Sequence, residues 1–157
     1  MHNAKAECLE FWEAFIEHLQ AIGSPIRRRK PQPQHWYDVA IGKSGVHLSL
    51  TIRLRNGDLG CELYLKTENA KELFHALRRD RKAIESDLGE LEWIELPNNK
   101  ASRIVVRAPY DISDRTVWPK AHIWLDSQAQ GFKSCFAPRV KRLIEVGTSP
   151  EPERPEG

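Results

Sequence analysis

The sequence predicts one α+β domain, in which an antiparallel sheet of about five strands carries helices mainly on one face, in the order α-βββ-α-ββ-α. Three observations predict it. An amphipathic helical pattern opens the chain, three alternating segments follow with short turns between them, and two more helical patterns flank a second pair of strands. We expect this domain to occupy residues 1–146 and the Pro/Glu-rich tail, 147–157, to be disordered.

Residues 4–22 place apolar side chains at three- and four-residue steps with glutamates between them, which is typical of an amphipathic helix. The apolar stripe comprises Leu9, Trp12, Phe15, Ile16, Leu19 and Ile22. Gly23 and Pro25 are expected to end the helix. The segment 27–34 is basic and rich in proline, and because proline neither donates to a strand ladder nor continues a helix, we expect an extended connector there.

Three strands are predicted at 36–41, 46–55 and 61–66. The second alternates without error, with apolar side chains at Val46, Leu48, Leu50, Ile52 and Leu54. Asn56 and Gly57 indicate a turn before the third strand. Short turns favour an antiparallel meander with one apolar face, which we expect to meet the helices, and one polar face, which is left for water or a partner.

The second half of the chain continues the same architecture. A helix capped by Thr67 or Asn69 is expected to end at Gly89, and strands at 91–96 and 102–108 follow it. A last helix is predicted from Ser113 or Asp114 to about Phe136, although a glycine at position 131 argues against an unbroken helix.

Composition argues against a membrane-spanning protein and against a disulfide-rich secreted protein, and it indicates no partner. The 24 basic and 22 acidic residues nearly cancel, and no apolar run approaches the roughly 20 residues of a membrane span. The first five residues lead directly into the amphipathic pattern, so we expect no secretory leader, and the three widely spaced cysteines contain no C-x-x-C pair. We therefore expect a cytoplasmic protein without a disulfide framework.

The sequence contains no catalytic motif of a common enzyme class, and its six histidines lack the spacing of metal ligands. We accordingly predict a non-catalytic protein with no metal or cofactor. One pattern that resembles the PD-(D/E)xK nucleases needs testing: Asp38 or Asp58 with Glu62 and Lys66. Four residues separate Glu62 from Lys66, which is about 13 Å along a strand and too far to share one water, so a solvated charge pair is favoured.

Charge is distributed unevenly along the chain. Residues 23–55 contain seven basic side chains and one acidic side chain, Asp38. Basic side chains mixed with an aromatic on a flat sheet bind phosphates and stack bases. The candidate nucleic-acid-binding residues are Arg27, Arg28, Arg29, Lys30, Arg53, Arg55, Tyr64, Lys66, Arg103 and Arg107. The alternative is that these side chains serve only solubility and edge protection of the sheet.

Several runs share their order and spacing with a known family. They are 9–12 (LEFW), 62–65 (ELYL), 69–74 (NAKELF), 84–85 (IE), 88–93 (LGELEW), 103–104 (RI), Trp118 and 124–125 (WL). Together they resemble the domain-of-unknown-function family 4268, over about residues 8–137. The resemblance implies a bacterial or archaeal protein of a kind often fused behind a PD-(D/E)xK nuclease domain of restriction or defence type. It supplies no catalytic residue. The chain has no room for the nuclease domain, so we expect either a stand-alone version or an excised C-terminal piece, and the Met1 start and the tail favour the stand-alone version.

Two hypotheses of function follow, and a degenerate nuclease is a third, less favoured one. The first is a non-catalytic accessory module that binds DNA or RNA weakly and electrostatically, beside a nuclease or other defence protein. The second is a protein-interaction or dimerisation domain without nucleic-acid binding, for which Trp36 is the candidate contact because the other tryptophans fit core stripes.

Overall fold

Five strands form one sheet in the order β1-β2-β3-β5-β4, with every neighbouring pair antiparallel. The computed structural model describes residues 3–147. The strands are β1 (Trp36–Lys43), β2 (Val46–Arg53), β3 (Asp58–Leu65), β4 (Glu92–Ile94) and β5 (Ser102–Ala108). The helices are α1 (Ala4–Ile22), α2 (Ala70–Arg79), α3 (Arg81–Leu88) and α4 (Trp118–Arg142), with short 3₁₀ and π turns at Arg115–Val117 and Leu143–Gly147. The predicted fold class and element order are confirmed.

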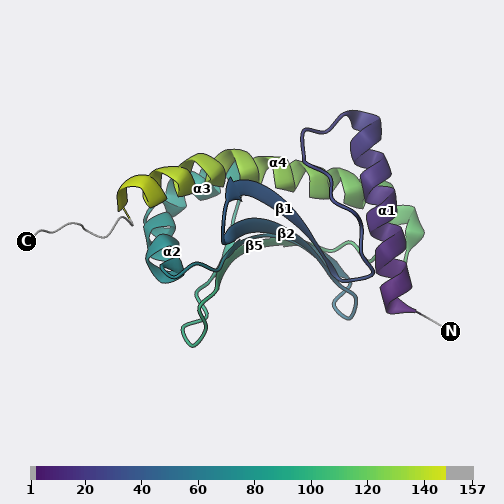
Figure 1. Cartoon of the computed structure of the whole chain (residues 1–157). Coiled ribbons are helices and arrows are strands. Elements are labelled where there is room, and N and C mark those ends of the chain that lie inside the picture. Colours follow the sequence, from purple (N-terminus) through teal and green to yellow (C-terminus); the bar gives the residue numbers. More distant parts are fainter. Residues whose placement is uncertain (1–2, 148–157) are drawn as a thin grey trace, which may run out of the picture.

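The sheet is arched, and the helices leave one of its faces uncovered (Figure 1). Helix α4 runs across the convex side and packs on β1, β2 and β3. Helix α1 stands at one end of the sheet and α2 at the other (Figure 1). The concave side of the arch faces away from α4, as expected for a sheet that alternates apolar and polar residues.

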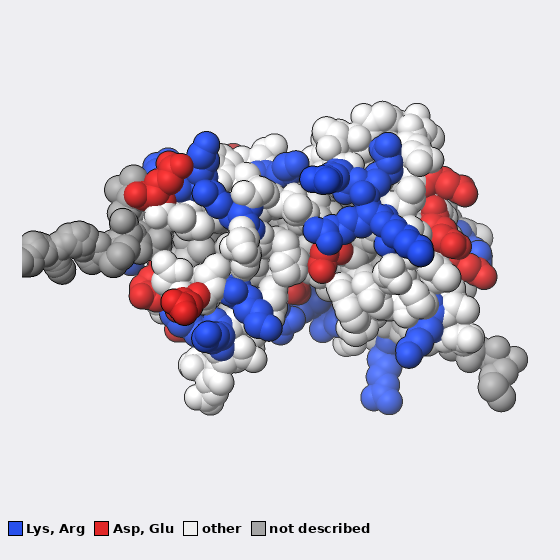
Figure 2. All heavy atoms as spheres, in the orientation of Figure 1, with Lys and Arg blue, Asp and Glu red and all other residues white. Residues whose placement is uncertain are grey.

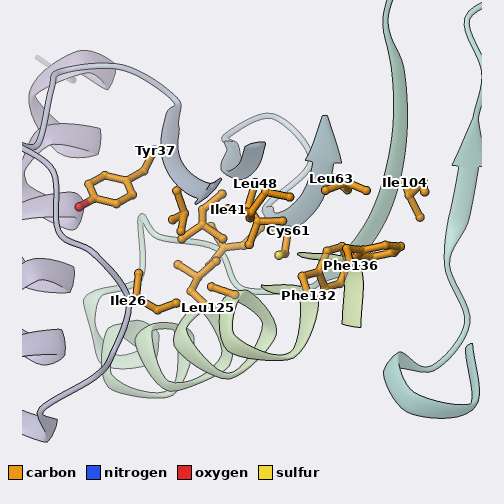
Figure 3. Packing of buried hydrophobic residues seen from close by; sticks show 14 of the residues in the cluster. Ile26, Tyr37, Ile41, Leu48, Cys61, Leu63, Ile104, Leu125, Phe132 and Phe136 are labelled. Carbon is orange, nitrogen blue, oxygen red and sulfur yellow. The ribbon is translucent and has the colours of Figure 1, made fainter. Parts of the chain in front are cut away.

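The core lies between the sheet and α4. Alternate residues of the first three strands point toward this helix and are buried, as the side-chain period of two requires. Figure 3 shows Leu48, Cys61 and Leu63 of the sheet facing Leu125 and Phe132 of α4. Burying such a leucine or phenylalanine side chain contributes about 1.5–3 kcal/mol to folding. All three cysteines of the chain, Cys8, Cys61 and Cys135, are buried as free thiols.

The hairpin between β2 and β3 differs from the prediction. Strand β2 ends at Arg53 instead of Arg55, and β3 begins at Asp58 instead of Cys61. Arg53 lies opposite Asp58 and donates two hydrogen bonds to its carboxylate, with Nε 2.9 Å from Oδ1. This ion pair extends the ladder as far as Asp58 and leaves Leu54 and Arg55 in the turn.

The predicted second helix is two helices, broken at Asp80. The break lets α2 pack on β5 and β3 while α3 packs on α4. The Asp80 carboxylate accepts a hydrogen bond from Arg139 Nε of α4 at 2.7 Å, which holds the break in place. The helix ends at Gly89 as predicted, but Asn69 makes no side-chain capping bond at the start.

Helix α4 extends past Phe136 to Arg142, six residues beyond the predicted end, and continues through Gly131 and Pro138. Gly131 is accommodated because α3 packs closely there, and a Cβ at this position would lie 3.3 Å from Leu88 Cδ2. Beyond Pro138, Val140 remains buried and continues the apolar stripe of Phe132 and Phe136. Tertiary packing therefore outweighs the local cost of glycine and proline in this helix.

Helix α1 fixes the connector that leads into β1. Its Trp12 Nε1 donates to the carbonyl of Gln34 at 2.8 Å. The hydroxyl of Tyr37 on β1 accepts from the backbone N–H of Arg29 at 2.6 Å and donates to the Arg29 carbonyl at 3.0 Å. These bonds hold the connector against the outer edge of β1.

No helix within residues 3–147 is long and apolar enough to cross a membrane. The predicted disordered tail lies outside the described residues, apart from Gly147 at the end of the π turn.

A buried histidine makes the stability of this fold depend on pH. His122 of α4 packs among the rings of Phe11, Phe15 and Trp118, and its Nε2 lies 3.2 Å from the Phe11 carbonyl. Burial lowers the pKa of His122 from 6.5 to about 4, against the hydrogen bond to Phe11, which raises it. The imidazole is therefore neutral in the folded protein at pH 7.

We expect the His122 contribution to the free energy of unfolding to fall between about pH 6.5 and pH 4, because the unfolded chain takes up the proton first. The loss reaches at most about 3 kcal/mol and levels off below pH 4. Urea unfolding from pH 7 to pH 4 measures it in the wild type and in His122→Gln, which can still donate to Phe11 but does not titrate. Equal pH dependence in the two proteins would contradict a neutral buried His122.

Candidate functional site

The open face, which is the concave side of the sheet, forms a hollow of about 580 Å³. Two hairpins, β2–β3 and β4–β5, project beyond this face and bound it at either end (Figure 1). The lining side chains are largely polar and come from β1, β2, β3, β5 and the residue before β1. They are His35, Trp36, Asp38, His47, Ser49, Thr51, Ile52, Arg53, Glu62, Tyr64, Arg103 and Arg107.

Strand register arranges most of these side chains in three rows across the sheet. The first row is His47, Tyr64 and Arg103. The central row is Asp38, Ser49 and Glu62, and it continues through Val105 to Glu92. The third row is Trp36, Thr51, Gly60 and Arg107. Two acidic groups therefore lie in the middle of the floor, with aromatic and basic groups on both sides of them.

Glu62 is the most buried charged residue of the open face, with 5% of its surface exposed. Burial raises the pKa of its carboxyl, and the nearby Asp38 adds to this effect, while Arg103 and Arg107 lower it in part. The Arg103 Nη1 atom lies 3.6 Å from Glu62 Oε1. Since desolvation is the largest cause, Glu62 holds a proton more readily than an exposed glutamate does.

The arginines of the open face each have a carboxylate partner. Arg103 faces Glu62, Arg107 Nε lies 3.7 Å from Glu92 Oε2, and Arg53 binds Asp58. The hydrogen bond from Arg53 lowers the pKa of Asp58. The floor is therefore close to neutral, because each of its arginines is paired with a carboxylate.

Two of the predicted site residues lie away from the hollow. Arg55 is exposed in the β2–β3 turn, and Lys66 follows the last residue of β3. Neither lines the hollow, whereas Arg53, Tyr64, Arg103 and Arg107 do. The structure thus brings together four of the predicted residues.

The basic run Arg27–Lys30 is exposed and lies along the β1 edge. Figure 2 shows Lys and Arg side chains gathered over the connector between α1 and β1. A second hollow, of about 370 Å³, lies between this connector and β1 and is lined by Arg29, Lys30 and Asp38, among others. Asp38 lines both hollows, so the basic connector adjoins the open face directly.

Trp36 lies at the end of the third row and is 38% exposed, as expected from its position outside the core stripes. At the other end of the face, His47 lies 3.5 Å from the Asp38 carboxylate, and its ring centroid is 5.2 Å from that of Tyr64. Aromatic surface is therefore available on two sides of the acidic row.

The β4–β5 hairpin is held by a lysine of α2. Lys71 Nζ donates to the carbonyls of Leu96 and Ala101, at 2.7 and 2.8 Å, and also to the carbonyl of Glu95. The hydroxyl of Ser102 accepts a further bond from it at 3.1 Å. One end of the open face is thus fixed by Lys71 and the other by the Arg53–Asp58 pair.

The nuclease-like pattern is not assembled as a nuclease would need. Ser49 stands between Asp38 and Glu62, so their backbones are about 10 Å apart across two strand spacings. Asp58 binds Arg53, and Lys66 lies outside the hollow. Within the described part of the chain, no three His, Cys, Asp or Glu side chains are grouped so that they could hold a metal ion.

Sequence reasoning missed the contribution of Gly60, which it placed in a turn. Gly60 lies inside β3, and a Cβ there would be 2.6 Å from Thr51 Oγ1 and 3.1 Å from Arg107 Nη1. The missing side chain therefore lets Arg107 and Thr51 meet over β3. A glycine within a strand often indicates such a close approach, and this was the available signal.

The family model for the domain of unknown function DUF4268 matches residues 8–140. The chain belongs to this family. The resemblance found in the sequence is thereby confirmed, and the matched region includes most of α1, the whole sheet and most of α4. Searches of curated proteins and of solved structures gave no match to the chain. Because the function of DUF4268 is unknown, the family assigns no role to any residue of the open face.

Gly60→Ala is expected to lower the free energy of unfolding by about 1–3 kcal/mol, because the new methyl group overlaps Thr51 and crowds Arg107. The loss should shrink by at least half in a Thr51→Ala background, which removes the closest atom. Urea unfolding of the two single variants and the double variant completes this cycle. Additive losses would show that Gly60 has no close contact with Thr51.

Proposed function

We propose that this DUF4268 protein is a non-catalytic nucleic-acid-binding accessory module that acts beside a nuclease in a prokaryotic restriction or defence context. The observation that supports the proposal is the junction at Asp38, where the basic connector adjoins the open face. A nucleic-acid strand needs cationic groups for its phosphates and aromatic or polar groups for its bases. The junction provides both within one surface.

The phosphate-binding part is the connector. Within residues 3–147, none of Arg27, Arg28, Arg29 and Lys30 pairs with a carboxylate, in contrast to the arginines on the floor of the open face. Their charges are therefore available to phosphates without the loss of an existing ion pair. The hydrogen bonds of Tyr37 to the Arg29 backbone hold this segment in place.

Contacts of this kind predict weak binding that depends on salt and little on sequence. Each phosphate neutralised on duplex DNA contributes about −0.9 to the slope of log K against log salt, and about −0.7 on a single strand. Changing Arg27, Arg28 and Arg29 together to alanine should flatten the slope by about two to three units and leave the fold intact, because these side chains are exposed. Fluorescence anisotropy with labelled oligonucleotides between about 50 and 200 mM salt measures it.

The matched control removes the same charge from another face. Arg78, Arg79 and Lys82 are exposed on α2 and α3, and their triple alanine variant should keep the wild-type slope. Failure of the wild type to bind DNA or RNA at about 50 mM salt would refute the proposal. Equal slope changes in both variants would show that binding follows net charge and does not use the connector.

The second candidate function is protein interaction. It is favoured by an apolar hollow of about 500 Å³ beside Trp36, lined in part by Ala4, Cys8, Pro33 and Leu54. Sedimentation of the purified protein, with and without a candidate nuclease, tests this function if nucleic acid does not bind.

A further inference from the structure

Trp36 lies where two hollows of different character meet. On one side is the polar hollow of the open face, and on the other is the apolar hollow that Cys8 and Leu54 help to line. Trp36 is exposed, whereas Trp12 and Trp118 are buried in the core. An exposed indole with an apolar recess on one side and a polar one on the other suits a flat ligand that has apolar faces and polar edges.

The floor of the open face carries polar atoms that the protein itself does not satisfy. Thr51 Oγ1, opposite Trp36 in the third row, and Arg103 Nε, in the first row, are buried and have no hydrogen-bond partner among the described residues. Most buried polar atoms in proteins are hydrogen-bonded, so such atoms in a hollow call for an explanation. Gly60 has no side chain to cover Thr51, since a Cβ at this position would lie 2.6 Å from Thr51 Oγ1.

The charges separate the places suited to phosphates from those suited to bases. Asp38 and Glu62 in the central row disfavour a phosphate over the middle of the floor, but carboxylates accept hydrogen bonds from the amino groups of bases. The unpaired cations lie at the rim, in Arg27–Lys30. A strand therefore fits with its phosphates along the connector and its bases turned toward the floor.

We infer that the open face binds an unpaired nucleotide of single-stranded nucleic acid, with the base stacked on Trp36 and its edge toward the central row. This inference rests on the proposed function and specifies its ligand. Asp38 is two residues from Trp36 on the same face of β1, about 7 Å along the strand, so a base on the indole reaches the carboxylate. In a duplex the faces of the bases are covered by their neighbours, whereas in a single strand they are free to stack on aromatic side chains.

Anisotropy measurements with three probes of equal strand length test the inference: a mixed-sequence 12-nucleotide strand, an abasic strand with the same phosphates, and a duplex. We expect the wild type to bind the base-bearing strand about 5- to 100-fold more tightly than the abasic strand, the range given by stacking of one base on an aromatic side chain. Trp36→Ala should lose this difference, and Trp36→Phe should retain most of it. The salt slope should not change in Trp36→Ala, because no phosphate contact is removed.

Ile123→Ala is the matched control, since Ile123 is an exposed apolar residue of α4, 58% exposed, and its truncation should leave binding unchanged. Thermal melts confirm that each variant is folded. Equal affinity for the base-bearing and abasic strands, or tighter binding of the duplex, would overturn this inference while the proposed electrostatic function stands. Absence of binding to all three probes would refute both.

Discussion

Burial of one face of the sheet against α4 is the constraint on which the rest of this structure depends. Side chains alternate between the two faces along β2, β3 and the part of β1 up to Ala40, so placing Leu48, Cys61 and Leu63 against α4 forces Asp38, Ser49 and Glu62 to the opposite side. A shift of one residue in any of these strands would exchange the two faces and leave charged groups in the core. The polar row of the open face is thus a consequence of core packing, and its composition is free to serve a ligand.

The open face combines opposing charges in a way that a surface selected for solubility alone does not require. Burial removes the Glu62 carboxylate from water and so raises its pKa. The positive charges of Arg103 and Arg107 lower the pKa again only in part. Exposed ion pairs contribute little to stability, and in buried ion pairs the desolvation penalty is often as large as the Coulombic attraction. The four cations of the connector, in contrast, are exposed and unpaired within the described residues. Two carboxylates in the central row of a nearly neutral floor, with a cationic rim beside it, are the basis for assigning bases to the floor and phosphates to the connector.

Much of this arrangement could be predicted from sequence because it follows from periodicity. The alternation from Val46 to Ile52 identified both faces of β2, and with them the placement of Tyr64, Arg103 and Arg107. Features set by contacts between distant segments could not be predicted in this way. The break at Asp80 depends on Arg139, and the close approach over Gly60 depends on Thr51 and Arg107. The pairing of each floor arginine with a carboxylate also depends on register across strands, which the order of charges along the chain does not show.

The most direct test of the account is to locate the bound strand on the protein. Backbone amide chemical shifts of isotope-labelled protein, titrated with a single-stranded oligonucleotide, report this residue by residue. The account predicts that the largest changes fall on the connector, on Trp36 and Asp38 of β1, and on the facing residues Ser49, Thr51 and Glu62, with little change along the exposed side of α4 around Ile123. Changes centred on α3 and α4, with none on β1 to β3, would contradict it.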